Sequence, residues 1–150
     1  MAEKTIAIEF EGWWRDVNKS FLPAKSGVYC VYKCTYNVTT DKINPYKLIY
    51  IGEAEDVKSR VANHDKYQAW LKHVGEGNEL CFSFGGVGTI DRVRAEAAMI
   101  FEHKPPENGE YRVSFFFDKT TMSLSGKTAL LNTNFTVNRT YANNGMQRTR

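Results

Sequence analysis

The sequence has few cysteines, few prolines and no long apolar run, and each shortage excludes a class of protein. Its 150 residues include three cysteines and four prolines. Cys30, Cys34 and Cys81 are odd in number and fit no zinc-ligand spacing, which indicates reduced core residues rather than a zinc site. No stretch approaches the ~20 apolar residues that cross a bilayer, and the N-terminus carries no secretory pattern. We therefore expect a cytoplasmic protein that does not insert into a membrane.

Net charge is low, but basic residues gather in the last part of the sequence. The formal net charge is +3, with 14 Lys and Arg against 16 Asp and Glu over residues 1–110, and 6 against 1 over residues 111–150. A basic segment attached to a near-neutral domain suits a polyanionic partner, because phosphate contacts release counterions. A tail that is merely soluble explains the same composition, so both interpretations stay open here.

Length and composition predict a single domain, residues 1–150, with an ordinary core. The hydrophobic content is 42%, which is usual for a soluble domain. Apolar patterning predicts strands over 6–12, 27–33, 48–51, 80–84, 120–125 and 133–137, the last two as a hairpin, and strand or extended structure over 113–117. Helical spacing predicts helices over 55–64, 67–75 and 89–104. We expect an α/β fold of the α+β type, with helices flanking a small central antiparallel sheet of three or more strands.

The stretch Leu48–His64 holds the most local information. Its apolar first part ends at Gly52, which is typical of a buried strand that stops at a tight turn. On the helix that follows, Arg60 and His64 lie within about 60° of the core-facing stripe. We expect both side chains to point toward the end of the preceding strand rather than into water. The strand before it divides its side chains between two faces: Tyr29 and Val31 on one, and Val28, Cys30 and Tyr32 on the other.

The helix predicted over 89–104 carries an unusually placed carboxylate. On a helical wheel Glu96 borders the apolar face around Val93, whereas Glu102 lies on the opposite side. A carboxylate beside an apolar face needs a cation, a metal or good hydrogen-bond donors to offset its desolvation. Geometry therefore favours Glu96 over Glu102 as a functional residue. The simpler alternative is an ion pair between Glu96 and Arg92, one turn earlier.

Two further motifs have ordinary explanations. Trp13 and Trp14 follow the first strand, where covering an edge of the core is the favoured interpretation and base stacking is the alternative. Ser125-Gly-Lys-Thr128 imitates the end of a phosphate-binding loop. The full pattern requires a glycine five residues before Gly126, and that position is Thr121, so we reject a phosphate-binding loop here.

Several segments, taken in order, resemble the signature of the GIY-YIG nuclease superfamily. Gly27-Val-Tyr29 and Tyr50-Ile-Gly52 are similar to its two tripeptides, each on a predicted strand. Arg60 lies ten residues after Tyr50, as the helix arginine of the family does. Glu96 and Asn108 are similar to the metal-binding glutamate and the late asparagine.

The resemblance covers residues 26–109 and leaves 110–150 as a basic C-terminal extension. Two departures stand out. Thr35–Tyr46, between the tripeptides, reads as an inserted loop. Glu53 occupies the position after Tyr-Ile-Gly, which is often lysine in the family.

The resemblance implies a metal-dependent endonuclease that hydrolyses DNA phosphodiester bonds with Mg²⁺ or Mn²⁺. The catalytic residues it implies are Tyr29, Tyr50, Arg60, His64, Glu96 and Asn108. In these roles Glu96 is the metal ligand, Arg60 clamps phosphate oxygens, and Asn108 positions the backbone. A tyrosine or His64 takes the proton from water, and a tyrosine of pKa ~10 needs nearby cations to do so.

Other functions stay open beside the nuclease. A compact restriction-type enzyme of this kind is a possible homodimer. A noncatalytic nucleic-acid-binding module that kept the fold is the alternative that Glu53 supports best. A partner-dependent subunit of a larger repair or defence assembly is the third.

Overall fold

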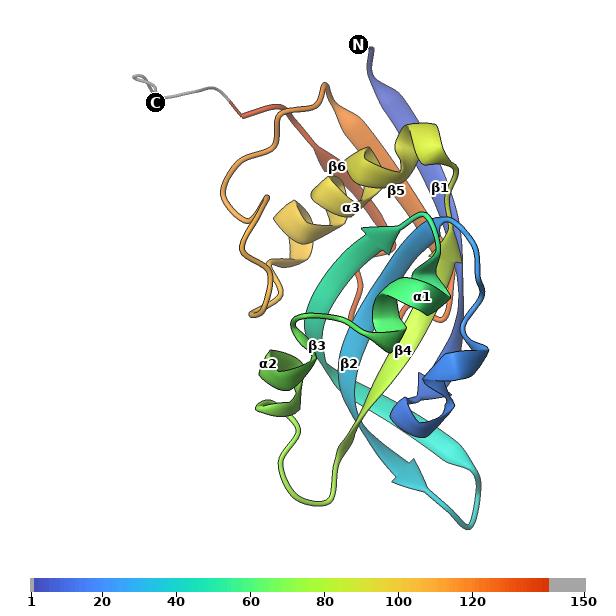
Figure 1. Ribbon diagram of the computed structural model, residues 1–150. Coiled ribbons are helices and arrows are strands. Elements are labelled where there is room, and N and C mark those ends of the chain that lie inside the picture. The colour runs from blue at the N-terminus through green and yellow to red at the C-terminus, as the bar shows by residue number, and fades with distance from the viewer. Residues whose placement is uncertain (1, 141–150) are drawn as a thin grey trace.

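Six strands form one curled sheet with helices on both faces (Figure 1). The computed structural model describes residues 2–140. The elements in chain order are β1 (Lys4–Arg15), the short 3₁₀ helix η1 (Asp16–Phe21), β2 (Gly27–Asn37), β3 (Lys42–Ala54), α1 (Val57–Ala62), α2 (Tyr67–Leu71), β4 (Glu79–Gly86), α3 (Thr89–His103), β5 (Thr120–Gly126) and β6 (Asn134–Val137). In the sheet the strands lie in the order β3-β2-β4-β1-β5-β6. The predicted mixture of helices and strands is confirmed.

The sheet is larger than its predicted minimum, and it is mixed. β2 pairs antiparallel with β3 and with β4, and β4 pairs antiparallel with β1. β5 instead runs parallel to β1, while β6 pairs back antiparallel on β5 as the predicted hairpin. The predicted central antiparallel sheet is present as β3-β2-β4-β1, whereas the parallel strand β5 beside it was not predicted. Parallel neighbours need a long crossover, and α3 with the segment that follows it supplies one between β4 and β5.

The two faces of β2 face two separate cores. Val28, Cys30 and Tyr32 pack in a cluster with α3, β1 and β5, whereas Tyr29 and Val31 pack in a cluster with α1, α2 and β4. The division of these side chains predicted from alternation is confirmed. Because both faces are covered, β2 is buried along most of its length.

The predicted inserted loop Thr35–Tyr46 is wrong, because most of it is strand. β2 and β3 continue as a hairpin, with Asn37 opposite Lys42 at its end, and Figure 1 shows this hairpin curving away from the rest of the sheet. In the turn, the Asn37 side-chain oxygen accepts hydrogen bonds from the backbone amides of Thr39 and Thr40 at 2.9 and 3.2 Å. The hairpin is mostly solvated here, so it carries little of the apolar alternation by which strands are recognised.

The two helices after β3 are shorter than predicted. The Asp56 side chain caps α1 by accepting from the Ser59 amide at 3.1 Å, but α1 ends at Ala62, so His64 lies beyond it. α2 ends at Leu71, and the chain continues to Gly75 in tighter turns with bonds to carbonyls three residues back. None of the helices within residues 2–140 has the length and apolarity to cross a membrane.

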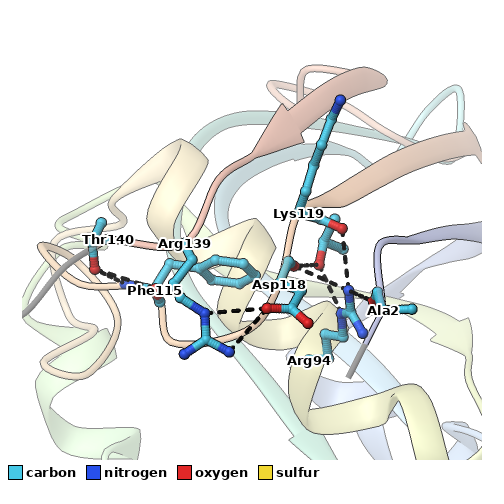
Figure 2. Close-up of polar contacts among 8 residues, drawn as sticks. Ala2, Arg94, Phe115, Asp118, Lys119, Arg139 and Thr140 are labelled. Atoms are coloured by element: carbon cyan, nitrogen blue, oxygen red, sulfur yellow. Dashed lines mark hydrogen bonds and ion pairs between the residues drawn. The ribbon is translucent and has the colours of Figure 1, made fainter.

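A buried arginine on α3 joins two neighbouring strands of the sheet, β1 and β5, to this helix. Arg94 is 6% exposed, and its Nε donates to the Thr120 hydroxyl at 2.7 Å. Its Nη2 lies within 2.9 to 3.1 Å of the carbonyl oxygens of Ala2, Asp118 and Lys119, as Figure 2 shows. One guanidinium therefore fastens the start of β1 and the start of β5 to the middle of α3.

The basic C-terminal segment does not behave as a separate tail. Phe115, Met122 and Val137 are buried in the same core as α3, although residues 113–117 form no strand. The guanidinium of Arg139 pairs with the Asp118 carboxylate at 3.1 Å (Figure 2). Residues 141–150, which carry the last two arginines of the sequence, lie outside the described part of the chain.

Candidate active site

The candidate site lies along β3, an edge strand with an irregular register. Val31 is opposite Tyr50, but the next residue, Tyr32, is opposite Leu48. Ile49 is therefore a bulged residue. A bulge re-aims neighbouring side chains, and Ile49 is buried in the same cluster against which Tyr50 packs.

A glycine lets the first predicted tyrosine cross the edge strand. Tyr29 is directly opposite Gly52, and a Cβ atom at Gly52 would lie 2.3 Å from both Cζ and Oη of Tyr29. Such a contact is far inside van der Waals distance. The two tripeptides are thus physically complementary, since the tyrosine of the first passes over the glycine of the second.

The two tyrosines, His64 and Trp70 form one aromatic cluster. Ring centroids are 6.2 Å apart for Tyr29 and Tyr50, 5.3 Å for Tyr50 and His64, and 4.4 Å for His64 and Trp70. Burial, together with the neighbouring Glu96, raises the pKa of Tyr50 to about 12. Burial also raises the pKa of Tyr29 well above its ordinary value, while the charge of Arg60 lowers it. Both phenols therefore hold their protons at neutral pH.

His64 is neutral, and its tautomer follows from its contacts. The side chain is fully buried, and Nδ1 accepts a hydrogen bond from the Lys66 amide at 3.0 Å. Burial and the charge of Arg60 lower the pKa of His64 to about 4. The proton therefore sits on Nε2, and no hydrogen-bond partner among the described residues reaches this atom. In this state His64 can donate a hydrogen bond from Nε2, but it cannot accept the proton of a water there.

Arg60 lies closer to solvent than expected. Its side chain is 42% exposed, and Nη2 donates to Asp65 Oδ1 at 2.8 Å. The expectation that it points away from water is therefore wrong, because the exposed carboxylate of Asp65, which lies beyond the end of α1, holds the guanidinium at the surface. Its charge nevertheless acts on both phenols of the cluster.

Three of the predicted residues meet in one pocket of about 170 Å³. The residues that line it are Tyr50, Lys66, Glu96, Ile100, Asn108, Gly109, Glu110 and Tyr111. Sequence reasoning missed Lys66 and Glu110. Their only signal was proximity, since each follows a predicted site residue by two positions. Tyr29, Arg60 and His64 do not line this pocket. The rings of Tyr29 and His64 lie 6.2 and 5.3 Å from the ring of Tyr50.

Asn108 holds the backbone of the edge strand. Its side-chain oxygen accepts from the Ile51 amide at 2.9 Å, and its side-chain nitrogen donates to the Ile51 carbonyl at 2.8 Å. One residue earlier, the Glu107 amide donates to the Ile49 carbonyl at 3.1 Å. The loop after α3 thereby extends the hydrogen bonding of β3 and fixes the wall of the pocket.

Glu96 is a carboxylate in an unfavourable environment. Burial, followed by the negative charges of Glu53 and Glu110, raises its pKa from the ordinary 4.5 to about 8. The alternative of an ion pair with Arg92 is wrong, because Arg92 pairs with Glu53 and also donates to Ser26 Oγ at 2.9 Å. Within residues 2–140 no ion pair offsets the charge of Glu96, and a hydrogen bond from the Glu53 backbone lowers its pKa without cancelling the effect of burial.

For the other residues of α3, the burial predicted from the helical wheel is only partly correct. Val93, taken as the centre of the apolar face, is 39% exposed, whereas Arg94 is buried. Glu102 accepts a hydrogen bond from the Asn132 side chain at 2.8 Å. The helix packs on more than one side because the segment after it folds back over α3, and a wheel drawn for a single apolar face cannot include this contact.

The donor atoms of the pocket fit a magnesium or manganese ion held by few protein ligands. No group of three or more His, Cys, Asp or Glu within residues 2–140 could enclose a metal by itself. Mg²⁺, however, keeps several waters and commonly binds one or two carboxylates. Glu96 and Glu110 line the same pocket, and the raised pKa of Glu96 is the effect that a bound cation would reverse.

No known family model matches the chain, and searches of characterised proteins and of solved structures find no match either. The function is therefore argued from the site. Its features, within residues 2–140, are a half-buried carboxylate without an ion-pair partner, one buried and one half-buried phenol, an arginine and a neutral histidine, gathered at one edge of the sheet.

Proposed function

We propose that the protein is an endonuclease of the GIY-YIG type that hydrolyses DNA phosphodiester bonds with Mg²⁺ or Mn²⁺. The observation that carries this proposal is the convergence of Tyr50, Glu96 and Asn108 on one pocket. These residues come from a strand, a helix and a loop that are far apart in the sequence. The complementarity of Tyr29 and Gly52 supports the same assignment, because it gives both tripeptides a shared structural role.

Each residue has a role that its surroundings support. Glu96, with Glu110, would hold the metal, which supplies charge stabilisation at the phosphate when bound. Arg60 has guanidinium donors beyond the one bound to Asp65 and can contact phosphate oxygens in the planar geometry that suits them. His64, whose Nδ1 accepts from the Lys66 amide, has a donor at Nε2 and therefore does not take the proton of the attacking water there.

One of the two tyrosines, Tyr29 or Tyr50, first releases its own proton to solvent and then, as the phenolate, accepts the proton of the attacking water. The raised pKa values oppose this step, so positive charge must offset them. Arg60 lowers the pKa of both phenols. The Lys66 ammonium lies 5.9 Å from the centre of the Tyr50 ring and is held by the Glu107 carbonyl at 3.0 Å. A second positive charge is thus fixed at the pocket.

A plasmid nicking assay tests the proposal directly. Supercoiled DNA incubated with wild-type protein should be converted to open-circle and linear forms with Mg²⁺ or Mn²⁺, and not with EDTA. Glu96→Gln keeps the size and polarity of the side chain but loses its charge, so cleavage should fall by more than ~10³-fold. Glu102→Gln, on the same helix but outside the pocket, is the matched control and should cut normally. Undiminished cutting by Glu96→Gln would remove the basis of the proposal.

A noncatalytic nucleic-acid-binding module is the second candidate, and Glu53 favours it. This residue adds negative charge beside Glu96 and occupies Arg92 in an ion pair, where relatives of the proposed family often have a lysine. A module of this kind would bind duplex DNA but leave the plasmid intact in every metal tested. Cleavage that appears only after a cell lysate is added would instead indicate a partner-dependent subunit. Sedimentation with and without DNA tests the proposed homodimer.

A further inference from the structure

A second and larger pocket lies at the opposite end of the β2–β3 hairpin from the candidate active site. Its volume is about 510 Å³, and it is formed by the end of β1, the hairpin near its turn and the residue after β5. The residues that line it are Trp13, Arg15, Asn18, Asp41, Lys42, Ile43 and Lys127. It shares no residue with the pocket that contains Glu96.

Two uncompensated lysines give this pocket its charge. Within residues 2–140 neither Lys42 nor Lys127 has an ion-pair partner, and both are exposed. Arg15, in contrast, is fixed, because Glu79 accepts from its Nε and Nη2 at 2.8 and 2.9 Å. Asp41 is the single acidic residue of the lining. Two exposed ammonium groups that line one pocket give it a positive potential, which attracts an anion.

The lysine of the rejected phosphate-loop motif reaches this pocket through backbone geometry. Gly126 has a φ of +82°, and a Cβ atom there would lie 2.2 Å from the Phe10 carbonyl oxygen. The next amide, of Lys127, donates to that oxygen at 2.8 Å. Only glycine allows so tight a turn after β5. The motif therefore forms no phosphate-binding loop, but it places Lys127 beside the end of β1.

Trp13 provides an aromatic wall that is already held in place. Its indole meets the Tyr32 ring edge-on, with centroids 5.1 Å apart and an interplanar angle of 84°. It is half-buried and packs against the core shared with α3. The favoured interpretation from the sequence, a tryptophan at the edge of the core, is confirmed, and the same side chain also lines the pocket. A fixed indole stacks a base at a small entropic cost.

We propose that this pocket binds an unpaired nucleotide of a nucleic-acid strand, with its base on Trp13 and its phosphates near Lys42 and Lys127. A base inside a duplex already stacks on its neighbours, so the indole would contact only a base that is free of them. The two lysines come from different segments, so each can contact a different phosphate of the strand. This inference deepens the proposed function, since it would give the nuclease a second contact to the strand, away from the cleaved bond.

Binding of a labelled twelve-nucleotide oligo(dT), measured in EDTA so that no cleavage occurs, tests this site. The Lys42→Glu/Lys127→Glu variant should lose at least ~10-fold in affinity. Its slope of log affinity against log salt should fall by about 1.4, because each lost phosphate contact on a single strand contributes about 0.7. Lys58→Glu/Lys72→Glu makes the same change of charge at two exposed lysines outside the pocket. This control variant should keep most of the affinity.

The aromatic wall is tested separately. Wild-type protein should bind oligo(dT) about 10-fold more tightly than an abasic strand of equal length, since stacking on one base is worth ~1–3 kcal/mol. Trp13→Phe retains a ring against Tyr32 but reduces the stacking surface, and should lose most of this preference. Thermal unfolding of each variant shows whether it has folded.

Several outcomes would overturn the inference. Equal binding of the abasic strand, or a salt slope unchanged in the lysine variant, would exclude the pocket. Thymidine monophosphate that binds as tightly as the oligonucleotide would make the ligand a free nucleotide rather than a strand. Failure of the proposed function is distinguishable, because cleavage can be absent while this binding persists.

Discussion

Replacing Glu96 by glutamine should stabilise the protein at alkaline pH while it abolishes cleavage. The pKa of Glu96 is about 8 in the folded protein, against the ordinary 4.5. The folded state therefore keeps a proton that the unfolded chain has lost across this range. The stability that this proton contributes is complete below about pH 4.5, falls progressively as pH rises, and is fully lost once the pH has passed about 8. Above pH 8 wild-type protein must fold with an unfavourable charge, which Glu96→Gln removes.

The size of the effect follows from the difference in pKa. At about 1.36 kcal/mol per pKa unit, the difference between about 8 and 4.5 has a ceiling near 5 kcal/mol. The side chain of Glu96 is only half-buried, and solvent screens its charge, so we expect ~1–2 kcal/mol. For a chain of this length such a gain raises Tm by about 2–8 °C.

Thermal unfolding in EDTA at pH 5, 7 and 8.5 measures this gain. Glu96→Gln should unfold at a higher temperature than wild type at pH 8.5, should keep most of that advantage at pH 7, and should unfold close to wild type at pH 5. Added Mg²⁺ should then raise the Tm of wild type more than that of the variant, because the folded state alone binds the ion. Glu102→Gln should show neither effect. Equal Tm values for Glu96→Gln and wild type at pH 8.5 would refute the claim that the carboxylate is destabilising.

Three other predictions concern the edge strand. Tyr29→Phe and Tyr50→Phe should both fold, and the one that removes the base should lower the cleavage rate by roughly 10²-fold, measured under single-turnover conditions; wild-type rates in both would make the phenols structural. Gly52→Ala places a methyl group against the Tyr29 ring end, so chemical denaturation should show a loss of ~1–3 kcal/mol, and a loss near zero would mean that the ring can move aside. Asn108→Ala leaves the Ile51 amide and carbonyl unpaired; it should cost ~2–4 kcal/mol and accelerate hydrogen exchange at Ile51, and unchanged exchange would contradict the positioning role.

Local patterns in the sequence predict the parts of the site that local structure determines. The alternation of Tyr29 with Val28 and Cys30 gives the correct face of β2, because side chains of a strand alternate by geometry alone. The wheel identifies Glu96 as the desolvated carboxylate of α3, because its immediate helical neighbours are apolar. The pKa of Glu96 supports this choice.

The remaining features depend on contacts between segments far apart in the chain. The parallel pairing of β5 with β1 is invisible in either strand alone. His64 leaves its predicted helix because α1 ends at Ala62, and it is then held by the Lys66 amide. Lys66 reaches the pocket through the Glu107 carbonyl, so its place depends on the loop after α3. Neither the hydrophobic periodicity of the sequence nor its composition contains information on these contacts.

The buried guanidinium of Arg94 limits where the protein can be truncated. A fragment that ended near residue 110 would contain Arg94 but lose the hydroxyl of Thr120 and two of the carbonyls that it binds. A buried charge left without such partners costs ~3–5 kcal/mol, which is a large part of the stability of an ordinary domain. Arg94 lies two residues before Glu96 on the same helix. We therefore expect that residues 26–109 cannot fold as an independent fragment. Fusion partners and truncations must leave both the first strand and residues 118–120 in place.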